Sequence, residues 1–337
     1  MIWSVLKKSW QQIPLLKTMR KKILISNIGF GDASSQAIGV LENKALVIEN
    51  KDRRRFTEED FIKTIQDVEI LIAGTEKITT SVLENAPCLK LIARVGVGVD
   101  NIDLDAAREK KISICYTPDA PSESVPEFTL ALIFNLLKGI GESDRKMHQA
   151  KWHRPMGRML SSCIVGIVGA GKIGSKVAQL IHSLSSSTTV LFYDPYVEAI
   201  PSAEKCDLED LLKRSDVVSL HLSLNAGTKG LINEDLLSKM KQGSYLINTS
   251  RGSVIDEGAL YTALQTKHLA GAALDVFNVE PYNGALTELD NCLLTSHIGS
   301  MTHEGRALME NQVAEDVVRY LDNQSLLRSL KGFDFAR

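Results

Sequence analysis

The chain has 337 residues, a length that favours two domains over one, and its 44% hydrophobic and 24% charged content is that of a globular protein. Its formal net charge of −2 and its pI near 6.4 give no general attraction to nucleic acid or to an anionic membrane, and no apolar stretch reaches the roughly 18 residues of a membrane span. The five cysteines form no C-x-x-C pair, which favours reduced thiols over disulfides or a zinc site. We therefore expect a cytoplasmic protein with no nucleic-acid partner, no membrane partner and no metal.

The first 20 residues mix tryptophan and aliphatic residues with lysine, and Pro14 interrupts them. A signal peptide requires a continuous apolar core of about 7–15 residues, which this segment does not have. Two interpretations stay open: a short amphipathic helix that docks on the protein or on a partner, and a frayed extension. In either case we assign residues 1–20 to an extension outside the folded domains.

Strand-like and helix-like segments alternate from Lys21 onward. Short apolar runs predict strands, and apolar residues at helical spacing predict the helices between them. An alternation of this kind forms βαβ units and hence a parallel sheet. The strands are expected at 23–28, 45–48, 68–73, 89–95 and 112–115, and the helices at 57–66, 79–85 and 103–110. A longer helical pattern covers 124–151, where Gly139 and Gly141 are expected to bend or break the helix.

The next segment has the pattern of a dinucleotide-binding βαβ unit. A buried-strand pattern at 163–168 precedes a glycine-rich turn and a helical pattern, and a second strand pattern then ends in Asp194. The three glycines allow a tight turn, close approach of backbone N–H groups to a pyrophosphate and close packing of the helix, whose N-terminus attracts phosphate. Asp194 would accept hydrogen bonds from ribose hydroxyls and repel a 2′-phosphate, so NAD is predicted in preference to NADP. The predicted cofactor-binding residues of this unit are Gly169, Gly171, Lys172, Ile173, Gly174, Asp194 and Pro195.

Further strands are expected at 217–222, 245–248, 272–276 and 292–296, followed by a helix at 302–323 that Thr302 would begin. The glycine motif thus opens the second α/β unit instead of the first. We predict two doubly wound parallel-sheet domains, and we expect the chain to cross between them at 118–121 and 299–300. His221 ends the first of these strands and is expected near the cofactor.

Three downstream blocks resemble the signature sequences of the D-isomer-specific 2-hydroxyacid dehydrogenase family. They are Asn248-Thr-Ser-Arg251-Gly-Ser-Val-Ile-Asp256-Glu-Gly-Ala-Leu260, Ala272-Ala-Leu-Asp275-Val-Phe-Asn-Val-Glu280-Pro281 and Thr295-Ser-His297-Ile-Gly299. Upstream, residues 94–103 resemble the substrate loop of the phosphoglycerate dehydrogenase branch, and the likeness runs in order from about 21 to about 323. The resemblance implies a substrate domain split into 21–117 and 300–337, an inserted NAD-binding Rossmann domain at 118–299, and an active site between them.

The resemblance also implies the chemistry. Reduction of a 2-keto acid needs a hydride on the carbonyl carbon and a proton on its oxygen. His297 is the implied proton donor, Glu280 bonds its far nitrogen, and Arg251 holds the substrate carboxylate and polarises the carbonyl. The backbone N–H groups of Val97 and Gly98 would hold the other carboxylate oxygen. The remaining residues assigned to the cofactor site are His221, Thr249, Asp275 and Gly299.

Several residues keep simpler interpretations. Arg251 could pair with Asp256 in a loop, the Glu280 segment could be a solvated turn, and the histidines other than His221 and His297 are expected to be structural and without partners. The family's usual loop prolines are missing at Ser223 and Ser296, which relaxes loops beside the nicotinamide without removing a reacting group.

The substrate stays open between several acids. Arg94 matches the branch that uses a phosphorylated hydroxy acid such as 3-phosphoglycerate, but it could equally form an ion pair. The run 53–55 of three arginines reads as a phosphate patch or, more simply, as a solvated loop. Glyoxylate, hydroxypyruvate and phosphite are alternative substrates, and a corepressor-like scaffold that binds NAD without catalysis is the alternative function. Because little sequence follows the last predicted helix, no appended regulatory domain is expected.

The helical segment 124–151, with Trp152 and Pro155 after it, resembles the segment through which family members form two-fold dimers. Its apolar content would be difficult to cover within one chain. We therefore expect a homodimer that acts on a small 2-hydroxy or 2-keto acid.

Overall fold

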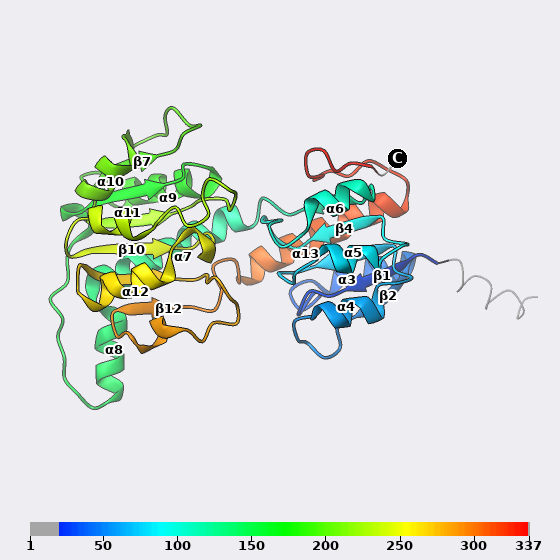
Figure 1. Ribbon diagram of the computed structural model, residues 1–337, viewed down its shortest axis with the longest axis horizontal. Coiled ribbons are helices and arrows are strands. Elements are labelled where there is room, and N and C mark those ends of the chain that lie inside the picture. Colours follow the sequence, from blue (N-terminus) through cyan, green and yellow to red (C-terminus); the bar gives the residue numbers. More distant parts are fainter. Residues whose placement is uncertain (1–19, 336–337) are drawn as a thin grey trace, which may run out of the picture. The chain divides into compact units, whose positions relative to one another are not determined.

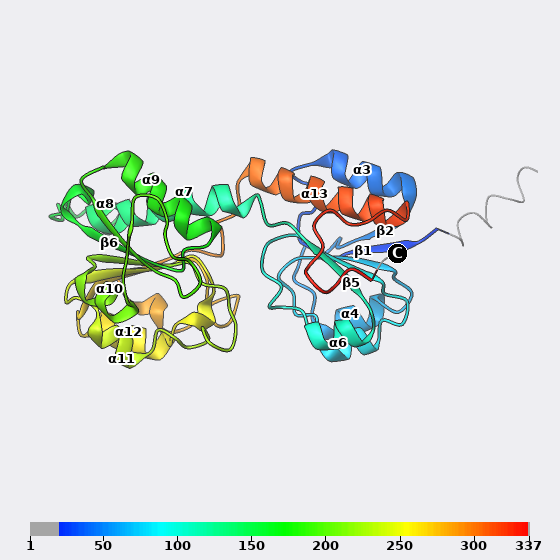
Figure 2. The same ribbon diagram turned by 90° about the horizontal axis from the view of Figure 1, so that it is seen from above.

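The computed structural model describes residues 20–335, so the predicted N-terminal extension lies outside the described residues apart from Arg20. The chain divides into two compact units (Figures 1 and 2). Unit 1 contains the chain up to Ala120 and again from Thr302, and unit 2 is the continuous segment Pro121–Met301. Among the described residues, no helix combines the length and the apolar character needed to cross a membrane.

Unit 1 is built on a parallel sheet whose described strands follow the order β2-β1-β3-β4-β5. Every residue of the inner strands β3 and β4 is buried, as is all but the first residue of the third inner strand, β1, because helices cover both faces of the sheet. Helices α3 and α13 lie on one face, and α4, α5 and α6 lie on the other (Figure 2). The bounds are β1 Lys22–Ile25, α3 Ser35–Lys44, β2 Leu46–Glu49, α4 Glu58–Thr64, β3 Ile70–Ala73, α5 Thr80–Glu84, β4 Leu91–Arg94, α6 Leu104–Glu109, β5 Ser113–Tyr116 and α13 His303–Leu321.

Helix α13 belongs to unit 1 although almost the whole of unit 2 precedes it in the sequence. Thr302 caps it by accepting a hydrogen bond from the backbone N–H of Gly305, as the sequence predicts. Its buried Val313 and Val317 join the core that α3 and the sheet form. In Figure 1, α13 (orange) runs beside the blue and cyan elements of the N-terminal segment.

Unit 2 contains a longer parallel sheet of order β12-β11-β10-β9-β6-β7-β8. Helices α7 and α9 cover one face, and α10, α11 and α12 cover the other (Figure 2). The bounds are α7 Pro121–Lys138, α8 Ile140–His148, η1 Leu160–Ser162, β6 Ile164–Val168, α9 Lys172–Leu184, β7 Thr189–Tyr193, β8 Glu204–Lys205, α10 Leu208–Arg214, β9 Val217–Leu220, α11 Glu234–Lys239, β10 Ser244–Asn248, η2 Gly252–Val254, α12 Glu257–Gln265, β11 Leu269–Leu274, η3 Ala285–Glu288 and β12 Cys292–Leu294.

These sheets confirm the predicted fold class of two doubly wound parallel α/β units. The glycine motif follows β6, which is the first strand of the second sheet. The long helical pattern breaks between α7 and α8 at Gly139, whose φ of 63° is left-handed and suits glycine.

A buried carboxylate connects the amino ends of three neighbouring strands of unit 2. Asp216, directly before β9, accepts hydrogen bonds from the backbone N–H of Ile164 (2.8 Å), from Arg158 Nη1 (3.0 Å) and from Lys241 Nζ (2.6 Å). Burial opposes ionisation of Asp216, but the donors outweigh it, and the pKa of this carboxyl lies below its usual range. The ionised side chain therefore stabilises the amino edge of the sheet.

We expect Asp216→Asn to lower the free energy of unfolding at pH 7 by about 1–2 kcal/mol, because Arg158 and Lys241 lose a charged partner while staying partly hydrated. A depressed folded-state pKa gives stability that is complete above about pH 4 and is lost as the pH falls through that pKa. The deficit of the variant in urea unfolding should therefore shrink as the pH falls below about 4. The exposed carboxylate in Asp210→Asn is the control; an equal loss in both variants would contradict this role of Asp216.

Candidate active site

The predicted functional residues of unit 2 lie at one edge of its sheet. All of the described strands of this sheet are parallel, so their carboxyl ends meet at that edge. Strand order reverses between β6 and β9, which is where doubly wound sheets bind ligands. The residues that follow the strands are Gly169 to Gly174 after β6, Asp194 and Pro195 after β7, His221 after β9, Thr249 and Arg251 after β10, Asp275 and Glu280 after β11, and His297 and Gly299 after β12.

The glycine turn fits a dinucleotide. Gly169 has a φ of 95°, and a Cβ at Gly174 would lie 2.0 Å from the carbonyl oxygen of Gly169, so both positions require glycine. Gly171 has open space where its Cβ would be, and as the N-cap of α9 it makes no side-chain capping bond. Lys172 and Ile173 form the first turn of this helix. The turn therefore offers open backbone at a helix N-terminus, which is a binding site for phosphate.

Asp194 lies against the glycine turn. Its Oδ2 accepts a hydrogen bond from the backbone N–H of Ala170 and its Oδ1 accepts one from that of Tyr196, both at 2.8 Å. These two bonds fix the carboxylate at the end of β7. Each oxygen keeps a further lone pair with which it could accept a hydrogen bond from a ribose hydroxyl.

His221 provides a neutral ring beside the same turn. Its backbone carbonyl would be 2.5 Å from a Cβ on Gly169, and its Nε2 lies 2.9 Å from Ser219 Oγ. Burial lowers the pKa of His221 to about 4, so the ring is uncharged at neutral pH. Its buried Nδ1 has no hydrogen-bond partner among the described residues.

Glu280 and His297 form a hydrogen-bonded pair. His297 Nδ1 lies 3.0 Å from Glu280 Oε2 and 3.2 Å from Oε1, and the backbone N–H of Phe277 donates to Oε1 at 3.2 Å. The side chains of His297 and Glu280 are 35% and 21% exposed, so the imidazole ring is oriented by Glu280 and is still accessible from solvent. The alternative of a simple solvated turn at Glu280 does not account for this pairing.

Arg251 lies in a loop that packs directly on the Glu280 segment. A Cβ at Gly252 would come within 2.0 Å of the backbone carbon of Phe277, so only glycine allows this approach. Asn248 Nδ2 donates to the carbonyl oxygen of Arg251 at 2.8 Å and holds the loop from the end of β10. Asp256, the alternative partner for Arg251, instead caps α12 by accepting from the backbone N–H of Ala259.

Asp275 holds the loop that carries His297. It is buried, and it accepts hydrogen bonds from the backbone N–H groups of Ile298 and Gly299 at 2.8 Å and from Thr295 Oγ1 at 2.6 Å. These bonds lie on both sides of His297, whose φ of 57° is unusual for a residue with a side chain. The sequence assigns Asp275 to the cofactor, which stays a prediction, whereas its role in the loop could not be read from the sequence.

Thr249 is fixed from the neighbouring helix, since its Oγ1 lies 3.2 Å from Thr129 Oγ1 on α7. The prediction that the other histidines have no partners was wrong for three of them, since His268 Nε2 lies 3.1 Å from the carbonyl oxygen of Leu237 and two others pair with carboxylates. His153 Nε2 lies 2.8 Å from Glu142 Oε1, and His148 pairs with Asp144 at 3.5 Å. Their carboxylate partners are near in sequence but not at the sheet edge, so both histidines stay structural.

The substrate residues predicted in unit 1 follow β4. Arg94 ends this strand and is only 6% exposed, while Val97 is exposed and Gly98 is half-buried. Gly96 between them has a φ of 142°, and a Cβ there would lie 2.6 Å from Arg94 Nη1. Arg94 is thus packed under the loop, and its charge lies near the buried Glu76, a residue that the sequence analysis missed.

Two residues of the arginine run 53–55 form ion pairs with carboxylates of unit 1. Arg53 pairs with Asp32, and Arg54 pairs with Asp60 at 2.5 Å. These pairs support the simpler interpretation of the run as an exposed loop.

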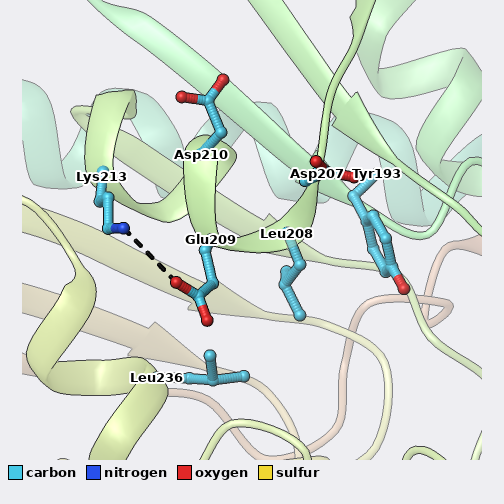
Figure 3. A pocket seen from close by; sticks show the side chains of 7 residues that line it. All are labelled: Tyr193, Asp207, Leu208, Glu209, Asp210, Lys213 and Leu236. Atoms are coloured by element: carbon cyan, nitrogen blue, oxygen red, sulfur yellow. Dashed lines mark hydrogen bonds and ion pairs between the residues drawn. The ribbon is translucent and has the colours of Figure 1, made fainter.

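Figure 3 shows a pocket of about 660 Å³ on the α10 side of unit 2. Three of its four charged lining residues are acidic, and the fourth, Lys213, has its Nζ 3.4 Å from Glu209 Oε2. The lining residues are Tyr193, Asp207, Leu208, Glu209, Asp210, Lys213 and Leu236, none of which belongs to the glycine turn or to the predicted catalytic set. The pocket is therefore separate from the candidate site residues, which lie at the carboxyl edge of the sheet.

Comparison with known proteins identifies the family. Residues 130–299 match the family model described as the NAD-binding domain of D-isomer specific 2-hydroxyacid dehydrogenases. The chain is 38% identical over 282 residues to a glyoxylate reductase of Thermofilum pendens, which covers 80% of this chain and 83% of that protein. The chain belongs to the D-isomer specific 2-hydroxyacid dehydrogenase family. It is accordingly an NAD-dependent oxidoreductase, which confirms the resemblance and the cofactor that the sequence indicates.

Two further relatives show the range of the family. A D-3-phosphoglycerate dehydrogenase of Methanocaldococcus jannaschii is 36% identical over 79% of this chain, which spans only 52% of that relative. The solved structure of a D-lactate dehydrogenase from Aquifex aeolicus, complexed with NAD and lactic acid, matches with a TM-score of 0.79 at 29% identity and covers 90% of this chain and 96% of that one. The family therefore includes proteins named for different acids, and the family alone does not select among them.

The glycine turn allows a matched test of cofactor binding. We expect Gly171→Ala to fold with an unchanged melting temperature, since nothing lies within 4 Å of its Cβ, but to bind NADH about tenfold more weakly because the methyl group faces the predicted phosphate position. Gly174→Ala should instead lower stability by about 1–3 kcal/mol, since its Cβ meets a backbone oxygen. Thermal unfolding and fluorescence titration with NADH separate the two effects. If Gly171→Ala bound NADH as tightly as the native protein does, the glycine turn would not be part of the cofactor site.

Proposed function

We propose that the protein interconverts a small D-2-hydroxy acid and its 2-keto acid with NAD(H), using Arg251, Glu280 and His297. The observation that carries this proposal is the hydrogen bond between His297 Nδ1 and Glu280 Oε2 at 3.0 Å, in a loop that Asp275 holds from both sides. A paired, partly exposed histidine at the edge where the glycine turn also lies is suited to proton transfer beside a nicotinamide.

The proton is assigned by the chemistry of the pair. An ionised carboxylate only accepts hydrogen bonds, so Nδ1–H of His297 donates a hydrogen bond to Glu280, and Nε2 is the nitrogen that exchanges a proton with the substrate. In reduction, His297 would give this proton to the carbonyl oxygen, and in oxidation it would take the proton from the hydroxyl group. Glu280 fixes the orientation of the ring throughout.

Arg251 is proposed to hold the substrate carboxylate. Its planar guanidinium can form two parallel hydrogen bonds with a carboxylate and can also polarise the adjacent carbonyl. The packing of Gly252 on Phe277 fixes this loop against the segment that bears Glu280. The backbone N–H groups of Val97 and Gly98 in unit 1 are proposed to hold the other carboxylate oxygen.

Bound NAD would supply the hydride acceptor, and NADH the hydride donor. Backbone groups of Gly171, Lys172 and Ile173 would hold the pyrophosphate, and Asp194 would accept the ribose hydroxyls. The 2′-phosphate of NADP would meet the Asp194 carboxylate, so we propose NAD as the preferred form. Pro195, His221, Thr249, Asp275 and Gly299 complete the proposed surroundings of the cofactor.

For the substrate we propose a small 2-keto acid of the glyoxylate or hydroxypyruvate kind. The likeness to glyoxylate reductase extends over most of both chains, whereas the phosphoglycerate dehydrogenase is matched over about half of its length. The position of Arg94 at the substrate loop is the observation that favours 3-phosphoglycerate as a second candidate.

We also propose that the protein works in the cytoplasm. Its cysteines are free thiols, and Cys115, Cys163 and Cys292 are buried. Burial raises the pKa of Cys292 to about 12, so this side chain stays a neutral thiol. Unpaired thiols suit a reducing compartment.

Replacement of the proton donor tests the mechanism. His297→Ala should reduce kcat with glyoxylate and NADH by about 10²-fold or more, the scale of general acid catalysis, and should leave the Kd for NADH nearly unchanged. The exposed His182 on α9 gives the control, since His182→Ala should behave like the native protein. A loss of kcat below about threefold would require another acid. If the protein binds NADH but reduces none of a panel of 2-keto acids, this result would instead support the alternative function of a corepressor-like scaffold without catalysis.

The segment after α8 supports a proposed homodimer. Trp152, Met156 and Met159 are 81%, 98% and 63% exposed in the single chain, and clustered exposed apolar side chains of this kind are typical of interfaces. Light scattering at micromolar concentration should give about twice the chain mass of 37.1 kDa. Met156→Glu should shift the protein toward the monomer, whereas Tyr196→Glu, at a similarly exposed site, should not. A monomeric native protein would contradict the proposal.

A further inference from the structure

A buried carboxylate occupies the ligand-binding edge of unit 1. Glu76 follows β3 and is 2% exposed. In the order β2-β1-β3-β4-β5, the direction of strand succession reverses between β1 and β3, and doubly wound sheets bind ligands outside the carboxyl ends at that point. Glu76 therefore lies where unit 1 is expected to contact a ligand, close to the loop 95–98 that follows the neighbouring strand β4.

The surrounding backbone is arranged around this carboxylate. The N–H of Gly74 donates to Glu76 Oε2 at 2.7 Å, and Asn101 Nδ2 donates to the carbonyl oxygens of Gly74 (3.2 Å) and Glu76 (2.7 Å). A Cβ at Gly74 would lie 3.0 Å from Glu76 Oε2 and 2.6 Å from Asn27 Nδ2, so a side chain there would displace the carboxylate. The buried position of Glu76 is thus specified by its neighbours.

Glu76 also changes the electrostatic character of Arg94. Both side chains are buried; Glu76 follows β3, and Arg94 ends the adjacent strand β4. Burial raises the pKa of Glu76, and the positive charges of Arg94 and Arg55 oppose that rise. The charge of Arg94, which the sequence alone offers to a distal phosphate, therefore lies within electrostatic reach of a buried carboxylate of the same unit.

We propose that Glu76 is a specificity-determining residue that excludes 2-keto acids carrying a distal phosphate and restricts the enzyme to small acids with an uncharged tail. This inference rests on the proposed function. A phosphate brought to the edge beside Arg94 would also approach the carboxylate of Glu76, and two anions in a poorly hydrated site repel each other. An uncharged tail, such as the hydroxymethyl group of hydroxypyruvate, meets no such repulsion.

The test compares hydroxypyruvate with its 3-phosphorylated form in the native protein and in Glu76→Gln. Glutamine keeps the shape and an acceptor for the N–H of Gly74 but removes the charge. The native protein should prefer hydroxypyruvate. In Glu76→Gln the ratio of kcat/KM for the phosphorylated acid to that for hydroxypyruvate should rise by about tenfold or more, mainly through a lower KM for the phosphorylated acid. Glu84→Gln, which removes the same charge from an exposed side chain at the end of helix α5, should leave the ratio unchanged.

A second measurement does not depend on the variant or on turnover. In the presence of NAD, D-glycerate should bind the native protein at least about tenfold more tightly than 3-phosphoglycerate does, as measured by calorimetry. Tighter binding of 3-phosphoglycerate, a native preference for the phosphorylated keto acid, or a ratio that moves less than about threefold in folded Glu76→Gln would overturn the role of Glu76. Failure of the native protein to reduce either acid would instead count against the proposed function, and the binding comparison would still decide the role of Glu76.

Discussion

The parallel direction of the strands is the constraint on which the active site depends. Because every described strand of unit 2 points the same way, segments more than a hundred residues apart end at one edge, and strand order sets their sequence along it. Arg251, Glu280 and His297 follow the adjacent strands β10, β11 and β12, while the glycine turn follows β6. Only short loops are then needed to bring reacting groups to a cofactor edge, and such loops can be held by a few buried bonds such as those of Asp275.

The sequence alone predicted the fold class and the glycine turn because both depend on local patterns. Apolar runs mark strands, helical spacing marks helices, and the glycines are required by contacts within one βαβ unit, as the approach of Gly174 to Gly169 shows. Arg251, Glu280 and His297 were selected through resemblance to a family. The break at Gly139 was also predictable, since glycine weakens a helix wherever it falls.

Asp275 and Glu76 show where such reasoning ends. Each carboxylate acts through backbone N–H groups that any residue could supply, so no neighbouring side chain in the sequence marks its role. Arg94 was interpreted without Glu76 because Arg94 ends β4 whereas Glu76 lies in the loop after β3, so the two come together only when the sheet forms. For the run 53–55 the sequence left a phosphate patch open but favoured a solvated loop, and the pairs of Arg53 with Asp32 and of Arg54 with Asp60 support that loop.

The return of α13 to unit 1 has a consequence for the order of folding during synthesis. Until residues near Val317 have left the ribosome, one apolar face of the unit 1 sheet lacks the helix that covers it beside α3. Unit 2 is continuous in sequence and is complete once Met301 has been made. The inserted unit can therefore fold first, while the N-terminal half of unit 1 waits with exposed apolar surface that a chaperone could bind.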